Sequence, residues 1–425
     1  MGDEIEQSIP GKKRCRVCLC SDMEIVYKAP LMPLGAQVVE PEDKFKPELF
    51  YPLHYAICHQ CSTFQSIELV PDRLMRSENM NVSATSKAVI ERDYEVFLEI
   101  QRSYNLDSQS FVVEIGGSDG VFLQYFLDKR IPVLNIEPVQ EVAEMARGKG
   151  IECAIEFLNE ELASKIVSDR GKADLVVAKQ VLEHVPDLGG FMKSCALMLS
   201  ENGTIMMEVP YVKDLIDGNF YDLIAHLRIY HFSLTSLDRL FSQHDLRIKE
   251  VIHYESLGGG VRFYAGWRDG VKVSESVRSL LLEEEKWGVN RPQYYNCKLR
   301  RGIQLRADLL RVIESIKREG KRIVGFGAGI KSSGLLNYCG LDGRYIDYLV
   351  DSAEHVQGKL MPGVRLPIYS PERIDDSVDY VLMLAWLHQE EIIDLLKPFT
   401  DNGGKIVIPT PEVRTYPGNK QEVAK

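Results

Sequence analysis

The segment VVEIGGSDG at residues 112–120 is an apolar strand pattern that ends in a glycine-rich turn and leads into a helical pattern. Glycines at such a turn let the backbone approach a ligand closely, and acidic side chains there can bind an amino or hydroxyl group. A second strand pattern, VLNI at 133–136, ends about twenty residues later in Glu137, the usual place for an acid that binds ribose hydroxyls. Together the two segments predict a nucleotide-type ligand at one end of a sheet.

The spacing of the turn indicates which ligand it binds. A dinucleotide site needs the spacing GxGxxG to hold a pyrophosphate, and the segment does not have it. The spacing E-x-G-x-x-x-G, from Glu114 to Gly120, instead fits the loop with which class I methyltransferases bind S-adenosylmethionine. The predicted cofactor contacts are Glu114, Gly116, Gly117, Ser118, Asp119, Gly120, Glu137, Pro138 and Lys179.

Strand and helix patterns alternate from Ser110 to about Ala265, and a second strand-turn-helix pattern begins at Lys321. Repeated βα units indicate parallel, doubly wound sheets. We therefore expect an α/β fold: a class I methyltransferase sheet, a small N-terminal zinc-binding module and a C-terminal Rossmann-like domain. The expected boundaries are 13–75 for the module, 76–265 for the methyltransferase domain, 266–318 for a helical connector and 319–415 for the C-terminal domain.

The zinc module is predicted from the spacing of four cysteines: Cys15, Cys18, Cys58 and Cys61. They form two CxxC pairs about forty residues apart, and such pairs can bind one tetrahedral Zn²⁺ through four thiolates. Four thiolates leave no open coordination position, so the zinc is expected to be structural. Cys20 and His59 are alternative ligands that fit the paired spacing less well, and unliganded thiols are the other interpretation.

Composition narrows the classes of partner. The chain has 425 residues and a formal net charge of −11, which argues against general nucleic-acid binding because phosphate contacts need clustered Lys and Arg. No stretch approaches the apolar length that spans a membrane, and the polar start MGDEIEQSIPGKKR lacks the apolar region of a signal peptide. We expect a cytoplasmic protein, monomeric or homodimeric, that acts on a small molecule and binds neither nucleic acid nor membrane.

The chain resembles the sugar C-methyltransferases of deoxysugar biosynthesis over nearly its whole length. The resemblance rests on both cysteine pairs and on FYPL at 50–53, VVEIGGSDG at 112–120, NIEP at 135–138, KADLVVAKQVLEHVPDL at 172–188, GGGVRFYA at 258–265, GFGAGIKSSGLLNYC at 325–339 and QGKLMPG at 357–363. It implies the three domains above, with a C-terminal domain that helps hold a nucleotide sugar. It also implies methyl transfer to a sugar carbon beside a 4-keto group, after a base removes a proton and an enolate forms.

The segment that would supply this base departs from the family pattern. The family usually reads F-D-x-I-Y-H-E-H-x-x-Y-F-S, whereas this chain reads YDLIAHLRIYHFS at 221–233. An ungapped match keeps His226 but places Arg228 where the family has its base, and arginine cannot act as a base near neutral pH. A gapped match retains Tyr230 and His231 instead.

A second departure lies at 79–86, where two tyrosines of the family have become asparagines, one of them Asn81. Correlated change on two walls of one pocket suggests a different acceptor. His184 sits where class I methyltransferases place a residue near the transferring methyl, and a histidine there can take a proton. The alternative is that His184 only binds loop backbone. The candidate catalytic residues are His184, His226, Tyr230 and His231, of which the last three could equally be packing residues.

In the C-terminal part, GFGAGIK at 325–331 follows a strand pattern and begins a helix, a suitable place for an anion, with Lys331 adding positive charge. A merely structural turn is the alternative. The family resemblance favours contact with a substrate phosphate or sugar. The predicted substrate contacts are Asn81, Arg228, Arg262, Gly327, Lys331 and Asp351.

These observations lead to one predicted function and two alternatives. The leading prediction is S-adenosylmethionine-dependent C-methylation of a nucleotide-linked ketosugar. One alternative is O- or N-methylation of a sugar or natural-product scaffold, with His184, His226 or His231 as base. The other is a catalytically silent subunit that binds the cofactor, against which the complete donor loop argues.

Overall fold

The central sheet follows from the strand patterns around the glycine-rich turn. The computed structural model describes residues 14–35, 38–70, 87–255 and 258–417. The strands of this sheet are β6 (Val112–Ile115), β7 (Val133–Ile136), β8 (Cys153–Ala154), β9 (Ala173–Lys179), β10 (Leu199–Val209), β12 (Leu246–Tyr254) and β13 (Gly260–Trp267). Their order is β12-β13-β10-β9-β6-β7-β8; β13 runs antiparallel to both of its neighbours, β12 and β10, and all other neighbouring pairs are parallel.

Helices cover both faces of this sheet because successive strand residues point to opposite sides. One face carries α2 (Lys87–Ser103), α3 (Val121–Asp128) and α4 (Gln140–Gly148), and the other carries α5 (Glu160–Arg170), α6 (Leu188–Met198) and α8 (Leu234–Ser242). Val112 packs with Phe97 and Phe126 on the first face, whereas its neighbour Val113 packs in the cluster of the second. The doubly wound α/β fold is therefore confirmed.

The N-terminal module is a four-stranded antiparallel sheet in the order β1-β4-β5-β11. Its strands are β1 (Met23–Lys28), β4 (His54–Cys58), β5 (Phe64–Ser66) and β11 (Tyr230–His231), and a separate pair is formed by β2 (Met32–Pro33) and β3 (Phe50–Tyr51). The fourth strand comes from far along the chain: Tyr230 pairs with Gln65, and His231 pairs with Phe64. The predicted segment 13–75 thus contributes only three of the four strands.

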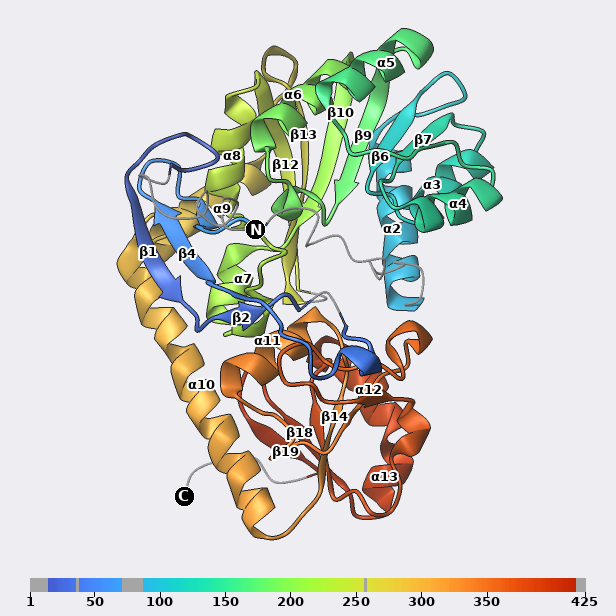
Figure 1. Cartoon of the computed structure of the whole chain (residues 1–425). Helices are drawn as coiled ribbons and strands as arrows, with labels where there is room; N and C mark the ends of the chain where they lie inside the picture. The colour runs from blue at the N-terminus through green and yellow to red at the C-terminus, as the bar shows by residue number, and fades with distance from the viewer. Residues whose placement is uncertain (1–13, 36–37, 71–86, 256–257, 418–425) are drawn as a thin grey trace.

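A second parallel sheet lies in the C-terminal part, drawn in orange and red in Figure 1. Its strands are β14 (Ile323–Phe326), β15 (Leu349–Val350), β16 (Ile368–Tyr369), β17 (Tyr380–Met383), β18 (Lys405–Ile408) and β19 (Arg414–Tyr416), accompanied by α11 (Ile330–Cys339), α12 (Gln389–Leu395) and α13 (Lys397–Asp401). The order is β16-β15-β14-β17-β18-β19, and only β19 is antiparallel. The chain crosses from one side of β14 to the other between β16 and β17, as in Rossmann-like folds.

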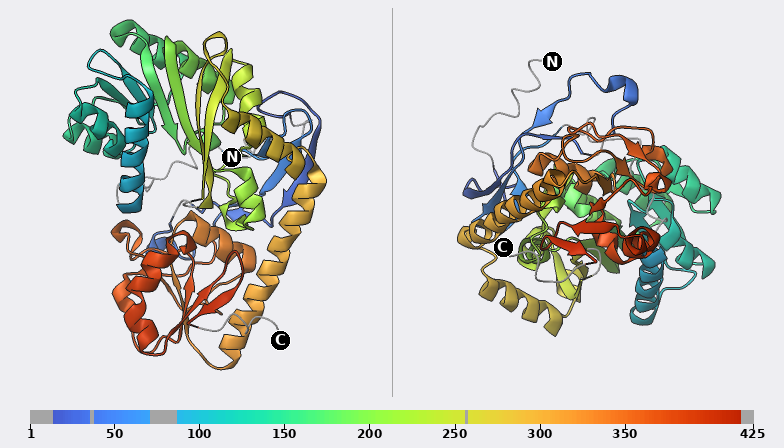
Figure 2. Two further views of the ribbon diagram at one scale, coloured as in Figure 1. Left: turned by 180° about the vertical axis from the view of Figure 1, so that it is seen from behind. Right: turned by 90° about the horizontal axis from the view of Figure 1, so that it is seen from below.

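Long helices join these parts. α10 (Pro292–Arg318) runs down one side of the molecule in Figures 1 and 2 and contacts β1, α7 (Val212–Asp217) and α11. α9 (Glu275–Trp287) instead packs against α8 and β12. Its buried Glu284 accepts hydrogen bonds from the N–H groups of Leu234 and Thr235, at 2.6 and 2.7 Å, where the α8 dipole favours a negative charge. The first half of the predicted connector is therefore attached to the central sheet.

The remaining short elements are 3₁₀ turns: Pro41–Asp43, Leu182–His184, Tyr221–Leu223, Arg268–Gly270, Glu354–Val356, Pro371–Arg373 and Trp386–His388. Two of them, Leu182–His184 and Tyr221–Leu223, lie between the central sheet and the other two parts of the chain and carry candidate functional residues. Across the described residues, the search for a helix that could cross a membrane found none.

Candidate active site

The glycine-rich turn after β6 is shaped by contacts with the end of β7. Gly116 has a φ of 68°, and a side chain at Gly117 would lie 2.6 Å from Asn135 Oδ1. Asn135 Oδ1 accepts a hydrogen bond from the Gly117 N–H at 3.1 Å, and its Nδ2 donates to the Ser118 carbonyl at 2.9 Å. Because the Ser118 N–H also donates to Glu137 Oε2 at 3.1 Å, the turn and the acid after the second strand meet at one edge of the sheet.

Glu114, on β6, is buried beneath this turn. Lys179 Nζ lies 3.5 Å from Glu114 Oε1 and 2.6 Å from Asp93 Oδ2 on α2. Glu114 Oε2 has no hydrogen-bond partner among the described residues, and a side chain at Gly117 would lie 2.9 Å from it. Burial raises the pKa of Glu114 to about 7, although the nearby Lys179 acts in the opposite direction. A free acceptor oxygen beside a glycine fits the α-ammonium group of S-adenosylmethionine.

The second acid, Glu137, is a buried acceptor at the end of β7. Its Oε1 accepts a hydrogen bond from the Val139 N–H at 2.9 Å, and burial raises its pKa. Its position after the second strand fits the ribose hydroxyls of the donor. Asp119 has a different environment, because Lys149 Nζ forms a 2.7 Å ion pair with Asp119 Oδ2. Pro138 is half-buried beside Glu137, and Gly120 (φ 79°) begins α3.

The four thiols predicted as metal ligands converge at one point, with sulfur atoms within 4.8 Å of one another: Cys15, Cys18, Cys58 and Cys61. Gln65 Nε2 donates to Cys15 Sγ at 2.9 Å, an outer contact of the kind that orients a metal ligand. Cys20 Sγ instead accepts from the Asp22 N–H, and His59 lies 3.7 Å from Glu24, so neither belongs to the cluster. Four thiols at this spacing fit a tetrahedral Zn²⁺ with no open position.

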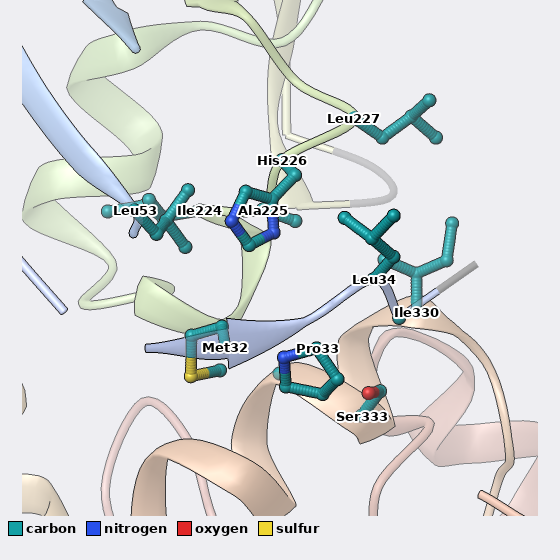
Figure 3. A pocket seen from close by; sticks show the side chains of 12 residues that line it. Met32, Pro33, Leu34, Leu53, Ile224, Ala225, His226, Leu227, Ile330 and Ser333 are labelled. Atoms are coloured by element: carbon teal, nitrogen blue, oxygen red, sulfur yellow. The ribbon is translucent and has the colours of Figure 1, made fainter. Parts of the chain in front are cut away.

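His226 lines a small, partly open hollow of about 20 Å³ between β2, the loop 224–228 and the start of α11. Figure 3 shows its ring among apolar side chains that include Leu34, Leu53 and Ile330. The ring Nε2 lies 3.2 Å from the Pro52 carbonyl, which can only accept, so Nε2 carries the proton. Burial lowers the pKa of His226. The hollow touches both the N-terminal and C-terminal parts, so it is a candidate acceptor site.

Tyr230 and His231, the other pair in the segment, form β11 and are buried inside the N-terminal sheet. Tyr230 is 0% exposed, and the His231 ring packs against Tyr55 and Phe64 at centroid distances of 5.5 and 5.7 Å. Burial lowers the pKa of His231 well below its usual value, and neither ring nitrogen has a hydrogen-bond partner among the described residues. Their burial favours the packing alternative that the sequence left open for both residues, and a catalytic role for them stays a prediction.

His184, the remaining candidate base, is 30% exposed and lies beside the loop 224–228. Its Nδ1 is 2.7 Å from the Leu227 carbonyl. His184 therefore binds loop backbone, as one interpretation of the sequence has it. Its second ring nitrogen is still available to accept a proton, so the catalytic interpretation stays a prediction.

Asp222 is a functional candidate that the sequence analysis missed. It is buried, its Oδ2 accepts a 2.7 Å hydrogen bond from Trp386 Nε1, and its Oδ1 has no partner among the described residues. Burial raises the pKa of Asp222, while Lys331 and Arg228 favour its charged form. Asp222 stands at the aspartate of the family pattern in the quoted segment 221–233, so the motif contains this residue but does not indicate its contact with Trp386.

Arg228 and Lys331 bring two positive charges to this junction. No ion-pair partner is found for either side chain among the described residues. Burial and the Arg228 charge lower the pKa of Lys331 to about 8. Lys331 lies at the second position of α11, where the helix dipole also favours an anion. The structure thus brings together two predicted substrate contacts in a setting suited to a phosphate.

The glycine turn of the C-terminal sheet is held by Asp351. Its two carboxylate oxygens accept hydrogen bonds from the N–H groups of Ala328 and Ala353, at 2.7 and 2.8 Å. Gly327 has a φ of 107°, and a side chain there would lie 2.8 Å from the Ala385 Cβ. These contacts make the turn rigid and give Asp351 a structural task beside its predicted contact with substrate.

Arg262 is placed differently from the prediction that it contacts substrate. Its side chain is 11% exposed and forms ion pairs with Glu99 at 2.8 Å and with Glu208 at 3.4 Å. Arg92 of α2 reaches the other oxygen of Glu208 at 3.0 Å. Arg262 therefore links α2 to the sheet, which favours a structural role for it, and its contact with substrate stays a prediction. Asn81 lies outside the described residues.

The parallel sheet, the glycine-rich turn and the two acids at its edge define a class I S-adenosylmethionine-dependent methyltransferase. Residues 89–251 match the family described as a methyltransferase domain. The fold and the predicted cofactor class therefore agree.

The remainder of the chain specifies the family. Residues 255–411 match the C-methyltransferase C-terminal domain. The chain is 31% identical over 403 residues to the C-methyltransferase NovU from Streptomyces niveus, which covers 94% of this chain and 96% of that protein. The chain therefore belongs to the sugar C-methyltransferase family that its sequence resembles, and it is an S-adenosylmethionine-dependent methyltransferase.

Other similarities cover part of the chain. The ubiquinone biosynthesis O-methyltransferase of Bradyrhizobium diazoefficiens is 27% identical over 106 residues, which are 25% of this chain and 42% of that protein. A methyltransferase structure from Anabaena variabilis is 16% identical with a TM-score of 0.34, over 41% of this chain and 84% of that one. Magnesium protoporphyrin IX methyltransferase from Synechocystis is 12% identical with a TM-score of 0.32, over 41% and 78%.

Proposed function

We propose that this methyltransferase transfers a methyl group to a carbon of a nucleotide-linked ketosugar. The observation that carries the proposal is the pairing of a complete donor turn with two cations, Arg228 and Lys331, at the junction with the C-terminal part. The full-length similarity to a C-methyltransferase supports carbon as the methylated atom. S-adenosylmethionine supplies the methyl group. Glu114 and Glu137 orient this donor by binding its amino group and its ribose hydroxyls, respectively.

A nucleotide diphosphate gives these two cations a partner. Burial is the main cause that lowers the pKa of Lys331; the charge of Arg228 lowers it further, and the carboxyl of Asp222 acts in the opposite direction. A bound anion would likewise oppose the repulsion between the two cations. Arginine binds phosphate through a planar fork, and a lysine at a helix N-terminus adds a point charge.

The remaining parts of the proposal concern organisation. We propose that the four-cysteine cluster binds one structural Zn²⁺ and that 13–75, 76–265, 266–318 and 319–415 act as module, methyltransferase domain, connector and substrate domain. The fourth strand β11 and helix α9 cross these boundaries. The acceptor is a small molecule, and the protein works as a monomer or homodimer in the cytoplasm.

The test is S-adenosylhomocysteine release by the purified enzyme against a panel of nucleoside diphosphate sugars, with and without a 4-keto group. The methyl position in each product is read by NMR. We expect turnover only with a ketosugar and a new methyl on the carbon beside the ketone. A methyl on oxygen or nitrogen would contradict the proposal and support O- or N-methylation instead. The presence of Arg228 at the position of the family base is the observation that favours this alternative. Donor binding without turnover on any sugar would favour a silent subunit.

A further inference from the structure

Glu183 is a fully buried acid that belongs neither to the donor site nor to the four-cysteine cluster. Its side chain is 0% exposed, and neither carboxylate oxygen has a hydrogen-bond partner among the described residues. Burying an unpaired carboxylate costs several kcal/mol, so natural chains rarely keep one without a compensating role. Glu183 also stands in the short turn Leu182–His184, directly after the strand that leads to the donor site.

The neighbour of Glu183 is the half-exposed His184. The Leu227 carbonyl, 2.7 Å from His184 Nδ1, can only accept a hydrogen bond, so Nδ1 carries the proton of the neutral ring. The lone pair is then on Nε2, and Nε2 lies 3.7 Å from Glu183 Oε1. This tautomer leaves Nε2 free to take a proton, and a carboxylate stands beside it to compensate the positive charge that results.

The pair also packs against the segment in which the family base is missing. The Ile229 N–H donates to the Glu183 carbonyl at 2.8 Å, and His184 binds the carbonyl of Leu227, so the loop carrying Arg228 is fastened to this turn on both sides. Arg228 occupies the position of the family base in the ungapped match and has no proton-accepting atom. His231 is enclosed in the N-terminal sheet. His226 is the competing base of the same loop.

We infer that His184 Nε2 is the general base of the reaction and that Glu183 is a positioning residue that stabilises the imidazolium. The inference rests on the proposed function, namely a ketosugar acceptor. The C–H bond beside the ketone breaks, its proton goes to His184 Nε2, and its electron pair forms the enolate. The enolate carbon then bonds to the methyl carbon as the C–S bond breaks, which releases S-adenosylhomocysteine. The exposed edge of His184 returns the proton to water.

Proton removal can be measured apart from methyl transfer. The full-length enzyme, with S-adenosylhomocysteine bound, is incubated in D₂O with a nucleoside diphosphate 4-keto-6-deoxyhexose, and loss of the proton signal beside the ketone is followed by NMR. We expect exchange to be about 100-fold slower in His184→Asn, which keeps a donor for Leu227, and about tenfold slower in Glu183→Gln. Glu183→Asp should recover part of the rate, because it restores a charge. KM for the sugar should change little in all three variants.

Thermal stability separates this role from a structural one. Removal of an unpaired buried charge by Glu183→Gln should leave Tm unchanged or raise it, whereas a carboxylate needed for folding would give a lower Tm. His244→Asn, at a half-buried histidine two residues beyond the end of α8, is the matched control and should exchange at the wild-type rate.

Two results would overturn the inference and one would overturn its premise. Wild-type exchange in His184→Asn would assign the base elsewhere, with His226 as the next candidate. Wild-type exchange, or a clear fall in Tm, in Glu183→Gln would remove the positioning role. If wild-type enzyme exchanges no ketosugar proton but methylates an oxygen or nitrogen, the proposed function fails first, and the base assignment for enolate formation falls with it.

Discussion

At the scale of single residues, the protonation of Glu114 should make donor binding depend on pH. Burial raises its pKa to about 7, so it is largely neutral below that value and cannot pair with the donor ammonium group. We expect S-adenosylmethionine affinity to rise by about tenfold between pH 6 and pH 8, measured by calorimetry. In Glu114→Gln the affinity should be low and should not rise over this range. A pH-independent affinity in the wild-type enzyme would show that Glu114 does not bind the ammonium.

The same shift has a consequence for stability, with a definite sign. A carboxyl whose pKa is higher in the folded state favours folding below its ordinary value of 4.5, and this contribution is lost as pH rises through about 7. The donor should therefore stabilise the enzyme most at pH above 7, where its ammonium meets a charged Glu114. Melting curves with and without S-adenosylhomocysteine at pH 6 and pH 8 measure this difference.

Lys331 should give acceptor binding the opposite pH dependence. Burial and Arg228 lower its pKa to about 8, so its positive charge is lost as pH rises through that value. We expect binding of a nucleoside diphosphate to weaken above pH 8, and Lys331→Met to bind about tenfold more weakly at pH 7 with no further loss at higher pH. Lys321→Met is the control, since Lys321 is exposed and paired with Asp379 at 2.8 Å. Unchanged diphosphate binding in Lys331→Met would place the phosphate elsewhere.

Residues whose task is set by local backbone were predictable from the sequence. The turn at Gly116 and Gly117 and the acid Glu137 are defined by their spacing after a strand, and the structure brings them to one edge. Residues whose task depends on a distant partner were not predictable. Nothing near Asp222 in the sequence points to Trp386, 164 residues away, which donates to it in the folded chain.

At the scale of elements, helix α2 is fixed on the sheet by charge as well as by apolar packing. Asp93 pairs with Lys179, and Glu99 pairs with Arg262, so both ends of the contact link α2 to strands that reach the donor site. The ion pairs of Arg262 with Glu99 and Glu208 could not be predicted from the sequence, because both partners are far from it along the chain.

Arg262→Met tests whether Arg262 stabilises the fold and does not contact the substrate. Loss of the cation leaves the buried Glu208 with Arg92 as its remaining partner, so we expect the free energy of unfolding to fall by about 3 kcal/mol. KM for the nucleotide sugar should stay near the wild-type value. Chemical denaturation and steady-state kinetics measure the two quantities, and Arg344→Met, in an exposed pair, is the control for stability. A raised KM with unchanged stability would restore the original prediction.

At the scale of the whole molecule, the four-cysteine cluster lies beside a sheet whose strands come from two distant parts of the sequence. Zinc should therefore be needed for the acceptor loop as well as for the N-terminal module. We expect Cys58→Ser to lose bound zinc, to lower Tm and to reduce turnover, because β4 carries Cys58 and lies next to β5, the partner of β11. Zinc content is measured by mass spectrometry of the purified protein.

Cys20→Ser is the matched control for that experiment, since Cys20 lies in the same module but outside the cluster. It should retain one zinc per chain and wild-type turnover. Equal zinc content in Cys58→Ser and the wild-type enzyme would contradict the four-thiolate site. The two α/β sheets were predictable from repeated βα units, but the origin of the fourth strand of the N-terminal sheet was not, because a two-residue strand has no periodic signal.

Because β11 comes from a distant part of the chain and completes the N-terminal sheet, it also limits how this enzyme can be recombined with its relatives. A chimera cut at residue 75 would pair a transplanted module with a host strand selected for a different neighbour, and Tyr230 and His231 would face unfamiliar side chains. A workable swap must carry the loop and strand 219–233 together with the N-terminal segment. Because that loop also holds Asp222 and Arg228, the module and the acceptor loop would have to be inherited as a single unit.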